Sequence, residues 1–216
     1  MRAILAYLVL AAAGVAAAPA PGGQAAPPAN ELATRLQTRY ESIRDFTADF
    51  TQTYRGVLMR QAATERGTIL LKKPSRVRFT YESPERKLFV SDGTVFRSYY
   101  PADRSGSESP LPKDDEVSTA LLFLAGRGNL VRDFTASIAT DAPAGEWHLG
   151  LVPRSKQADF NTLTLFVDPR TLALRGFATT DDQGTNTIRF ANLKENTGLT
   201  DRAFAFTFPK GTEIIR

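Results

Sequence analysis

Residues 45–54 read Asp-Phe-Thr-Ala-Asp-Phe-Thr-Gln-Thr-Tyr, and large or apolar side chains alternate with small polar ones along this stretch. A strand places successive side chains on opposite faces of a sheet, so a period of two is typical of a strand with one buried face. The alternation predicts a half-buried strand. The side chains expected on its core face are Phe46, Ala48, Phe50, Gln52 and Tyr54.

The same alternation recurs along most of the chain. Asp92-Gly93 joins two predicted strands as a hairpin turn in which both central residues must accept positive φ. Asp168-Pro169 and residues 181–184 are turn sequences between later strands. Since the chain lacks the helix–strand alternation of a parallel sheet, we expect an antiparallel meander of about ten or eleven strands. Besides the first, the predicted strands cover residues 68–72, 77–81, 88–91, 95–100, 131–140, 147–151, 161–167, 172–179, 185–193 and 203–208.

Two segments predict short helices instead. Asn30 is the expected N-cap of the first helix, whose apolar residues recur with a period near 3.6. This stripe consists of Leu32, Leu36, Tyr40 and Ile43. Residues 118–125 predict a second, very apolar helix, after acidic residues at 114–116 that favour a helix N-terminus. A helix inserted into a meander has few places to lie except over a face of the sheet.

The N-terminal residues have the composition of a targeting segment followed by a linker. Arg2 precedes an apolar run and then small residues, which is typical of a cleaved secretory signal peptide over residues 1–17. An uncleaved anchor is the alternative, but the apolar run is shorter than the roughly 20 residues that span a bilayer. Residues 18–29 are Ala, Pro, Gly and Gln and predict a flexible leader. We expect an exported protein with one domain, residues 30–216.

Bulk composition excludes several classes of protein. Hydrophobic residues make up 42% and charged residues 23% of the 216-residue chain, which is ordinary for one folded domain. The chain has no cysteine, so we expect no disulfide and no thiol for a lipid anchor, and a soluble domain stabilised by its core alone. The formal net charge of +4 is too small to indicate nucleic acid as a partner.

No catalytic motif is recognisable in the sequence. His148 is the only histidine, and its ring is expected on the solvent side of a strand. There is no cysteine, nucleophile elbow, phosphate-binding glycine loop or metal-binding histidine pair. The pairs Asp114-Asp115 and Asp181-Asp182 would suit a glycosidase or a calcium site, but a helix start and a hairpin turn explain them more simply. We therefore predict no enzyme activity, no catalytic residue, no metal and no cofactor.

Phenylalanine dominates the aromatic residues, with 14 Phe against 6 Tyr and 1 Trp. For any single Phe, an ordinary core position is the simplest interpretation. As a set on a long curved sheet beneath short apolar helices, they favour a cavity for a hydrophobic ligand.

Six short motifs follow one another along the chain. They are Phe50-Thr51-Gln52, Gly67-Thr68-Ile69-Leu70-Leu71-Lys72-Lys73-Pro74, Arg78-Phe79-Thr80-Tyr81-Glu82-Ser83-Pro84, Val90-Ser91-Asp92-Gly93, Tyr99-Tyr100-Pro101 and Phe204-Ala205-Phe206-Thr207-Phe208-Pro209-Lys210-Gly211-Thr212. In this order and at this spacing they resemble the LolA family of periplasmic outer-membrane lipoprotein carriers. The resemblance extends from residue 30 to the C-terminus.

The resemblance implies an α+β fold: an unclosed antiparallel β-barrel under a lid of two or three short helices, with a hydrophobic cavity between them. It also implies a monomeric, non-enzymatic carrier in the periplasm. Its partners would be acylated lipoproteins, an inner-membrane ABC-type lipoprotein release complex and an outer-membrane lipoprotein receptor. A related exported lipid-binding or envelope-sensing module is the alternative, and a hydrolase a more distant one. The receptor that shares the fold needs an N-terminal lipidated cysteine, which this chain lacks.

The resemblance also suggests site residues. In the family, a basic residue just before the proline of a Lys-x-Pro motif donates to backbone carbonyls of the lid and holds the cavity shut. Lys73 has this position here, where relatives often have arginine, and a solvated lysine at the sheet edge is the alternative. The sheet-side cavity candidates are Phe50, Leu70, Val77, Phe79, Leu88 and Val90. The lid candidates are Leu32, Leu36, Leu121, Leu122 and Leu124.

Overall fold

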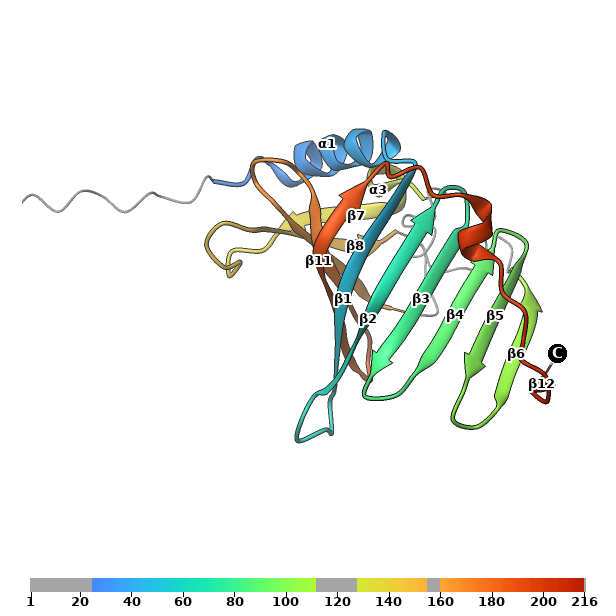
Figure 1. Cartoon of the computed structure of the whole chain (residues 1–216). Coiled ribbons are helices and arrows are strands. Elements are labelled where there is room, and N and C mark those ends of the chain that lie inside the picture. The colour runs from blue at the N-terminus through green and yellow to red at the C-terminus, as the bar shows by residue number, and fades with distance from the viewer. Residues whose placement is uncertain (1–24, 112–127, 155–159, 216) are drawn as a thin grey trace, which may run out of the picture.

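In the computed structural model, which describes residues 25–111, 128–154 and 160–215, twelve strands form a single sheet (Figure 1). The strands are β1 (Asp45–Gly56), β2 (Ala63–Lys72), β3 (Arg76–Ser83), β4 (Lys87–Asp92), β5 (Val95–Tyr100), β6 (Ser105–Pro110), β7 (Phe134–Ile138), β8 (Trp147–Pro153), β9 (Thr162–Val167), β10 (Leu174–Thr180), β11 (Gly184–Glu195) and β12 (Glu213–Ile215). Their order is β12-β6-β5-β4-β3-β2-β1-β11-β10-β9-β8-β7. The two end strands do not pair with each other, so the predicted unclosed, curved sheet is confirmed.

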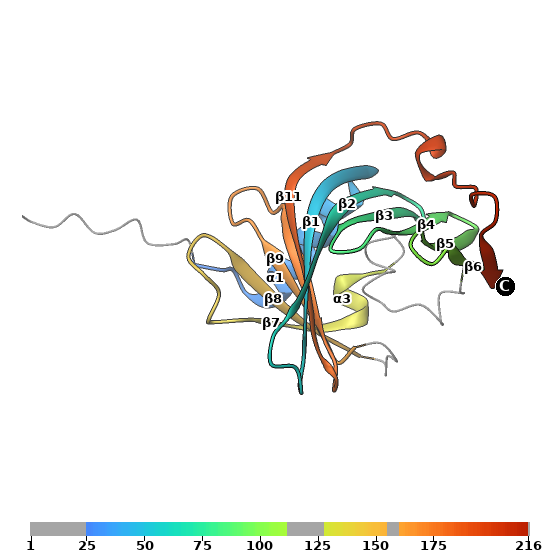
Figure 2. The ribbon, with the colours of Figure 1, turned by 60° about the horizontal axis from the view of Figure 1, so that its bottom comes forward.

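Two meanders, β1 to β6 and β7 to β11, make up most of the sheet, and β12 adds to its edge beside β6. The two meanders join in the middle, where Phe50 of β1 lies opposite Phe190 of β11. Neighbouring strands are antiparallel except β12 and β6, which run parallel. Figure 2 shows that the sheet curves around the helices α1 (Ala29–Glu41) and α3 (Leu130–Asp133). We call the face toward these helices the inner face and the opposite face the outer face.

Helix α1 presents the predicted apolar stripe to the inner face. Leu32, Leu36 and Tyr40 are buried, and the helix contacts β7 and β8. The predicted cap at Asn30 is wrong, because the helix already begins at Ala29, after Pro28, and no side chain caps it. Proline is tolerated at a helix start because its missing N–H needs no partner there.

The predicted strand over residues 131–140 begins instead as the helical turn α3. The side chain of Asn129 accepts hydrogen bonds from the amides of Val131 and Arg132, which is an N-cap, and β7 starts only at Phe134. The amide of Leu130 donates to the side chain of Gln37 on α1 (2.9 Å). The turn thus ties α1 to the edge of the sheet.

The C-terminal segment crosses the outer face and is not the strand that the alternating Phe residues predict. Residues Asp201–Phe204 form a 3₁₀ turn, η1, and the chain then runs outside the ladder until β12. The buried carboxylate of Asp45 starts this path, since it accepts from the amide (2.6 Å) and hydroxyl (2.8 Å) of Thr197. The alternating Phe residues of this segment therefore reflect packing against the outer face, and the segment is not a strand of the sheet.

The sheet has a core on each face. The larger one lies on the inner face beneath α1 and α3 and contains Trp147, Leu149 and Leu151 of β8. The smaller one lies on the outer face, where Phe204 is fully buried against Leu88 and Val90. β4 therefore has apolar side chains on both faces, Leu88 and Val90 on the outer face and Phe89 on the inner face, which explains why its sequence is more continuously apolar than a simple alternation.

The predicted hairpin at Asp92-Gly93 is present, but its backbone differs from the expectation. Only Gly93 has positive φ (99°). Asp92 instead accepts from the amides of Thr94 and Val95 with one carboxylate oxygen (2.9 Å each), so its side chain takes over part of the turn. The turns at Asp168 and Asp181 use the same device.

Several expectations fall on residues that the structure does not describe. The predicted signal peptide, most of the leader and the apolar helix with Leu121, Leu122 and Leu124 lie outside the described residues. Within the part that is described, no helix is both long and apolar enough to cross a membrane.

Candidate ligand-binding face of the sheet

A row of aromatic rings crosses the inner face from β1 to β5, and we call it the aromatic row. The ring of Phe50 contacts that of Tyr81 (4.9 Å between centroids), and Tyr81 contacts Phe89 (5.6 Å). Phe89 in turn contacts Phe96 (6.3 Å) and Tyr100 (6.0 Å). Distances of this size are typical of attractive aromatic pairs, so the row forms one continuous apolar surface.

The row passes over β2 because Gly67 has no side chain. In the ladder, Gly67 lies opposite Phe50 on one side and Tyr81 on the other, at an irregularity between β2 and β3. A Cβ atom added at Gly67 would lie 2.0 Å from the carbonyl oxygen of Thr80, which is backbone and cannot move aside cheaply. A glycine here lets the rings of β1 and β3 meet across the strand that separates them.

Part of the row is open to solvent. Phe89 and Phe96 are half-buried and Tyr100 is exposed, whereas Phe50 and Tyr81 are buried. Burial, with the nearby carboxylate of Glu65 adding to it, raises the pKa of Tyr81, so its hydroxyl stays protonated.

Polar side chains border the row at the end of the sheet away from α1. The hydroxyl of Tyr81 donates to the side chain of Gln52 (2.6 Å), which donates to Asn186 of β11 (3.0 Å). Lys87 pairs with Glu65 (2.6 Å), and its ammonium lies 4.4 Å from the centre of the Tyr81 ring. The apolar surface therefore ends in a hydrogen-bonded polar rim.

Lys73 links the sheet to the last turn of α1. Its ammonium donates to the backbone carbonyl of Tyr40 and lies 3.7 Å from the centre of the Tyr40 ring. Burial lowers the pKa of Lys73 to about 8, against the opposing effect of the Glu41 carboxylate. A partly buried cation that touches a helix carbonyl is a suitable device for holding the helix against the sheet.

The six sheet-side candidates do not lie on one face. Phe50, Val77 and Phe79 belong to the inner core, on the side of the helices. Leu70, Leu88 and Val90 pack on the outer face with the C-terminal segment, so the structure places them away from any space beneath α1. An alternation with a period of two divides the side chains of a strand into two sets. Where both sets contain apolar residues, the alternation does not show which set lies on the inner face.

Two of the lid candidates can be placed. Leu32 and Leu36 are fully buried on the underside of α1. Sequence reasoning missed Tyr81, Phe89, Phe96 and Tyr100, although the pairing of residue 79 with residue 89 across the β3–β4 hairpin would have extended the row.

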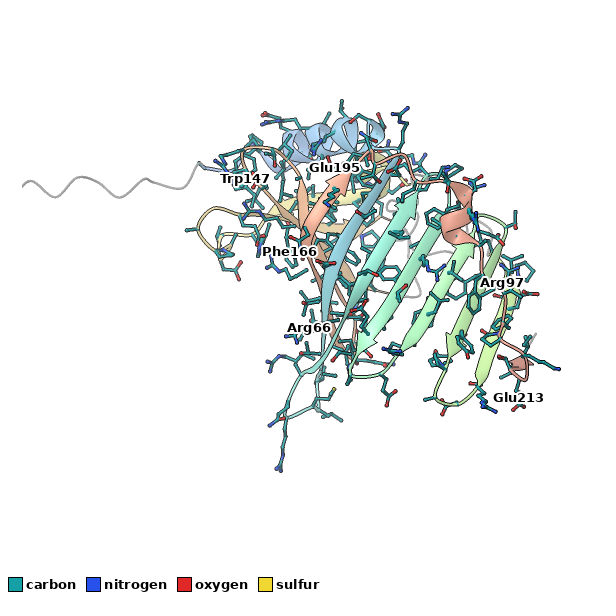
Figure 3. All side chains as sticks on the ribbon, in the orientation of Figure 1. Arg66, Arg97, Trp147, Phe166, Glu195 and Glu213 are labelled. Carbon is teal, nitrogen blue, oxygen red and sulfur yellow. The ribbon has the colours of Figure 1, made fainter. Side chains whose placement is uncertain are left out.

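A small cavity remains where α1 meets the sheet, with a volume of about 20 Å³. Apolar side chains such as Leu36, Phe46 and Leu174 line it, together with the ion pair of Arg39 and Glu195 (2.6 Å; Glu195 is labelled in Figure 3). This is room for about one water molecule. A long ligand at this place would have to displace α1.

His148 and the polar side chains around it make contacts that stabilise the fold. His148 lies on the outer face, but its side chain is only 15% exposed, because it contacts Glu146 (2.8 Å) and the ring of Phe166. Glu146 also accepts from Arg189 (2.7 Å). Among the described residues, no group of three or more acidic or histidine side chains could hold a metal ion.

Comparison with known proteins gives a family match over most of the chain. The family model described as "Outer membrane lipoprotein carrier protein LolA" matches residues 41–207, most of the chain. The chain belongs to the LolA family. The match includes the aromatic row, Lys73 and most of the segment that crosses the outer face.

Members of the LolA family with curated names resemble the chain over most of their length. An outer-membrane lipoprotein carrier protein of Nitrosomonas europaea is 29% identical over 185 residues, covering 84% of this chain and 87% of the relative. One of Chromohalobacter salexigens is 30% identical over 189 residues, covering 85% and 86%. A crystal structure of an uncharacterized conserved protein from Thermus thermophilus has the same fold, with a TM-score of 0.53, 13% identity, and coverage of 86% and 97%.

Proposed function

We propose that the protein is a periplasmic carrier that covers the acyl chains of lipoproteins with the inner face of its sheet. The observation that carries this proposal is the aromatic row, a continuous and partly open apolar surface on the concave side of a LolA-family sheet. The names of its relatives support lipoproteins as the cargo.

The physical need for such a carrier is plain. At about 0.8 kcal/mol per methylene, a long acyl chain costs on the order of 10 kcal/mol to expose to water. A surface that bound the chains as tightly as a bilayer would never release them. Moderate affinity, with a cover that opens and closes over the surface, satisfies both requirements.

We assign the cover to α1, with Leu32 and Leu36 facing the ligand space. We assign the sheet side to Val77, Phe79 and the aromatic row, which includes Phe50. In this proposal the protein acts as an exported monomer without enzyme activity. It receives its cargo from an inner-membrane ABC-type release complex and delivers it to an outer-membrane receptor.

Lys73 is the proposed latch of the cover, because its ammonium touches the carbonyl and the ring of Tyr40 on α1. Removing the hydrogen-bond donor in Lys73→Leu, which a neutral amine would still supply, is expected to leave the protein folded but to open the cover more often. The expected result is a several-fold change in the affinity for a fluorescent acyl probe, with little change in the unfolding curve. Unchanged probe binding would contradict the latch role.

The latch is also expected to depend on pH. The pKa of Lys73 is about 8 in the closed form, below the ordinary value of 10.5, so closing releases a proton between these pH values. Raising the pH from 8 toward 10 therefore stabilises the closed form, and acyl-probe affinity should fall a few-fold. In Lys73→Arg the guanidinium keeps its charge over this range, and the dependence should vanish. The same dependence in both proteins would rule out Lys73 as its origin.

Depletion tests the carrier function itself. In cells that lack the protein, lipoproteins destined for the outer membrane should accumulate in the inner-membrane fraction. If sorting is normal while the purified protein still binds acyl probes, the protein is a lipid-binding module without an essential sorting role.

A further inference from the structure

The hairpin between β1 and β2 projects beyond β3 on one side, and its turn lies beyond the start of β11 on the other. β3 ends at Ser83, opposite Arg66, so the part of β2 before Arg66 has no neighbour on that side. On the other side, β11 begins at Gly184, opposite Gly56. Figure 1 shows the hairpin extending past the other strand ends, on the side of the sheet away from α1, and Arg66 marks its base in Figure 3.

Three consecutive residues in the turn of this hairpin are apolar and exposed. Val57 is 72% exposed, Leu58 97% and Met59 41%, and these three follow one another in the chain. The other large apolar residues with comparable exposure in the described ranges occur singly or at the chain end, as Val152 does on the outer face. Soluble proteins rarely expose a contiguous run of apolar residues at a projecting tip unless these residues contact a partner.

Hydrogen bonds anchor the start of the tip. The amide of Val57 donates to the carbonyl of Gln183 in the β10–β11 turn (2.8 Å), and the hydroxyl of Tyr54 reaches the same carbonyl. The run is therefore presented as part of a supported hairpin, so little ordering is needed when it meets a partner.

Cations flank the apolar run. Arg55 and Arg60 are exposed, and neither has an ion pair with any residue that the structure describes. The acidic groups of the adjacent turn are engaged otherwise, since Asp181 accepts from backbone amides and Asp182 from Asn161 (2.7 Å). Apolar side chains at an extremity with unpaired arginines beside them match the layering of a bilayer surface, where hydrocarbon lies beneath anionic headgroups.

We propose that the β1–β2 tip is a membrane-contact site, at which Val57, Leu58 and Met59 insert reversibly into an anionic lipid surface and Arg55 and Arg60 bind its headgroups. The polar rim at Gln52 lies only a few residues from the tip along β1, so contact through the tip brings the rim end of the inner face toward the lipid. Such lipid binding requires only the protein itself and goes beyond the proposed carriage of lipoproteins.

Vesicle binding tests the site without any cargo. The purified protein is sedimented with vesicles of phosphatidylethanolamine and phosphatidylglycerol, and in parallel with vesicles of phosphatidylcholine alone. We expect binding to the anionic vesicles that weakens as salt rises, and at least about tenfold weaker binding to the neutral ones. Leu58→Glu should lower binding to the anionic vesicles by about tenfold or more, and Arg60→Glu should lower it while removing much of the salt dependence.

Matched variants control for folding and for the insertion of the tip into the bilayer. Val152→Glu places the same charge on another exposed apolar residue and should bind like the parent protein. Unfolding curves of Leu58→Glu and the parent should coincide, because the residue is 97% exposed. In Leu58→Trp the indole emission should shift to the blue with anionic vesicles, whereas in Val152→Trp it should not.

Three results would overturn the proposal: no binding of the parent protein to anionic vesicles, equal binding by Leu58→Glu, or equal binding to neutral vesicles. If Leu58→Glu blocks delivery of lipoproteins while vesicle binding is absent throughout, the tip contacts a protein instead. Each of these results leaves the acyl-probe test of the carrier function unaffected.

Discussion

Phe204→Ala is expected to lower the free energy of unfolding by about 3–5 kcal/mol, the usual range for emptying a buried phenylalanine site. Phe204 is fully buried on the outer face, where it fills the core formed with Leu88 and Val90. Its backbone is held there as well, because Arg78 donates to the carbonyl of Ala203 (3.3 Å). Neighbours fixed by the sheet cannot collapse into the vacated space, which places the expected loss in the upper part of this range. Urea unfolding followed by circular dichroism measures it.

Phe206→Ala is the matched control in the same segment. Phe206 packs on Tyr99 (5.6 Å between ring centroids) but is only partly buried, so its removal should cost less than half as much. Equal losses in the two variants would show that Phe204 does not anchor the segment. Hydrogen exchange adds a local readout, since β12 should lose protection in Phe204→Ala before the rest of the sheet does.

Phe89→Asp is expected to weaken the binding of a fluorescent acyl probe by more than about tenfold, since a buried apolar side chain contributes roughly 1.5–3 kcal/mol and an unpaired charge costs more. The side chain lies in the middle of the aromatic row, in contact with Tyr81, Phe96 and Tyr100. A carboxylate there interrupts the apolar surface along which an acyl chain would lie. Fluorescence titration with the probe gives the dissociation constants.

Val152→Asp controls for the added charge, because Val152 is apolar and half exposed but lies on the outer face of β8. Its probe affinity should equal that of the parent protein. Phe89 is only partly buried, so Phe89→Asp should still fold, and its unfolding curve shows whether it does. Undiminished probe binding by folded Phe89→Asp would place the acyl chains elsewhere.

Most of the sheet can be predicted from local pattern alone. Wherever a strand has one face on the core and the other toward water, as in β1 and β8, the alternation of side chains determines both its extent and its buried set. The hairpin turns are equally local, because the Asp side chains at 92, 168 and 181 close them with their own carboxylates. Helix α1 is recognisable for the same reason, from its single stripe.

The rest depends on contacts between distant parts of the chain. Leu70, Leu88 and Val90 look like inner-face residues until the segment around Phe204 is known to cover the outer face. β6 has a polar sequence and becomes a strand by pairing with β5 and β12, so no apolar period marks it. Only the family resemblance suggests that Lys73 contacts a backbone carbonyl of the lid, because the carbonyl that it meets, that of Tyr40, lies 33 positions away in the chain.

The pairing of β1 with β11 has a consequence for how the protein forms. Phe50 and Phe190 are neighbours in the ladder but 140 positions apart in the chain, so this seam cannot close until nearly all of the polypeptide is available. Closing such a remote pairing is slow, because the entropy of a large loop must be lost before the contacts that compensate for it are made. In the meantime the first hairpin has a bare edge along β1, open to pairing with other chains. A newly made molecule is therefore expected to be most prone to aggregation in the interval before residues 184–195 arrive.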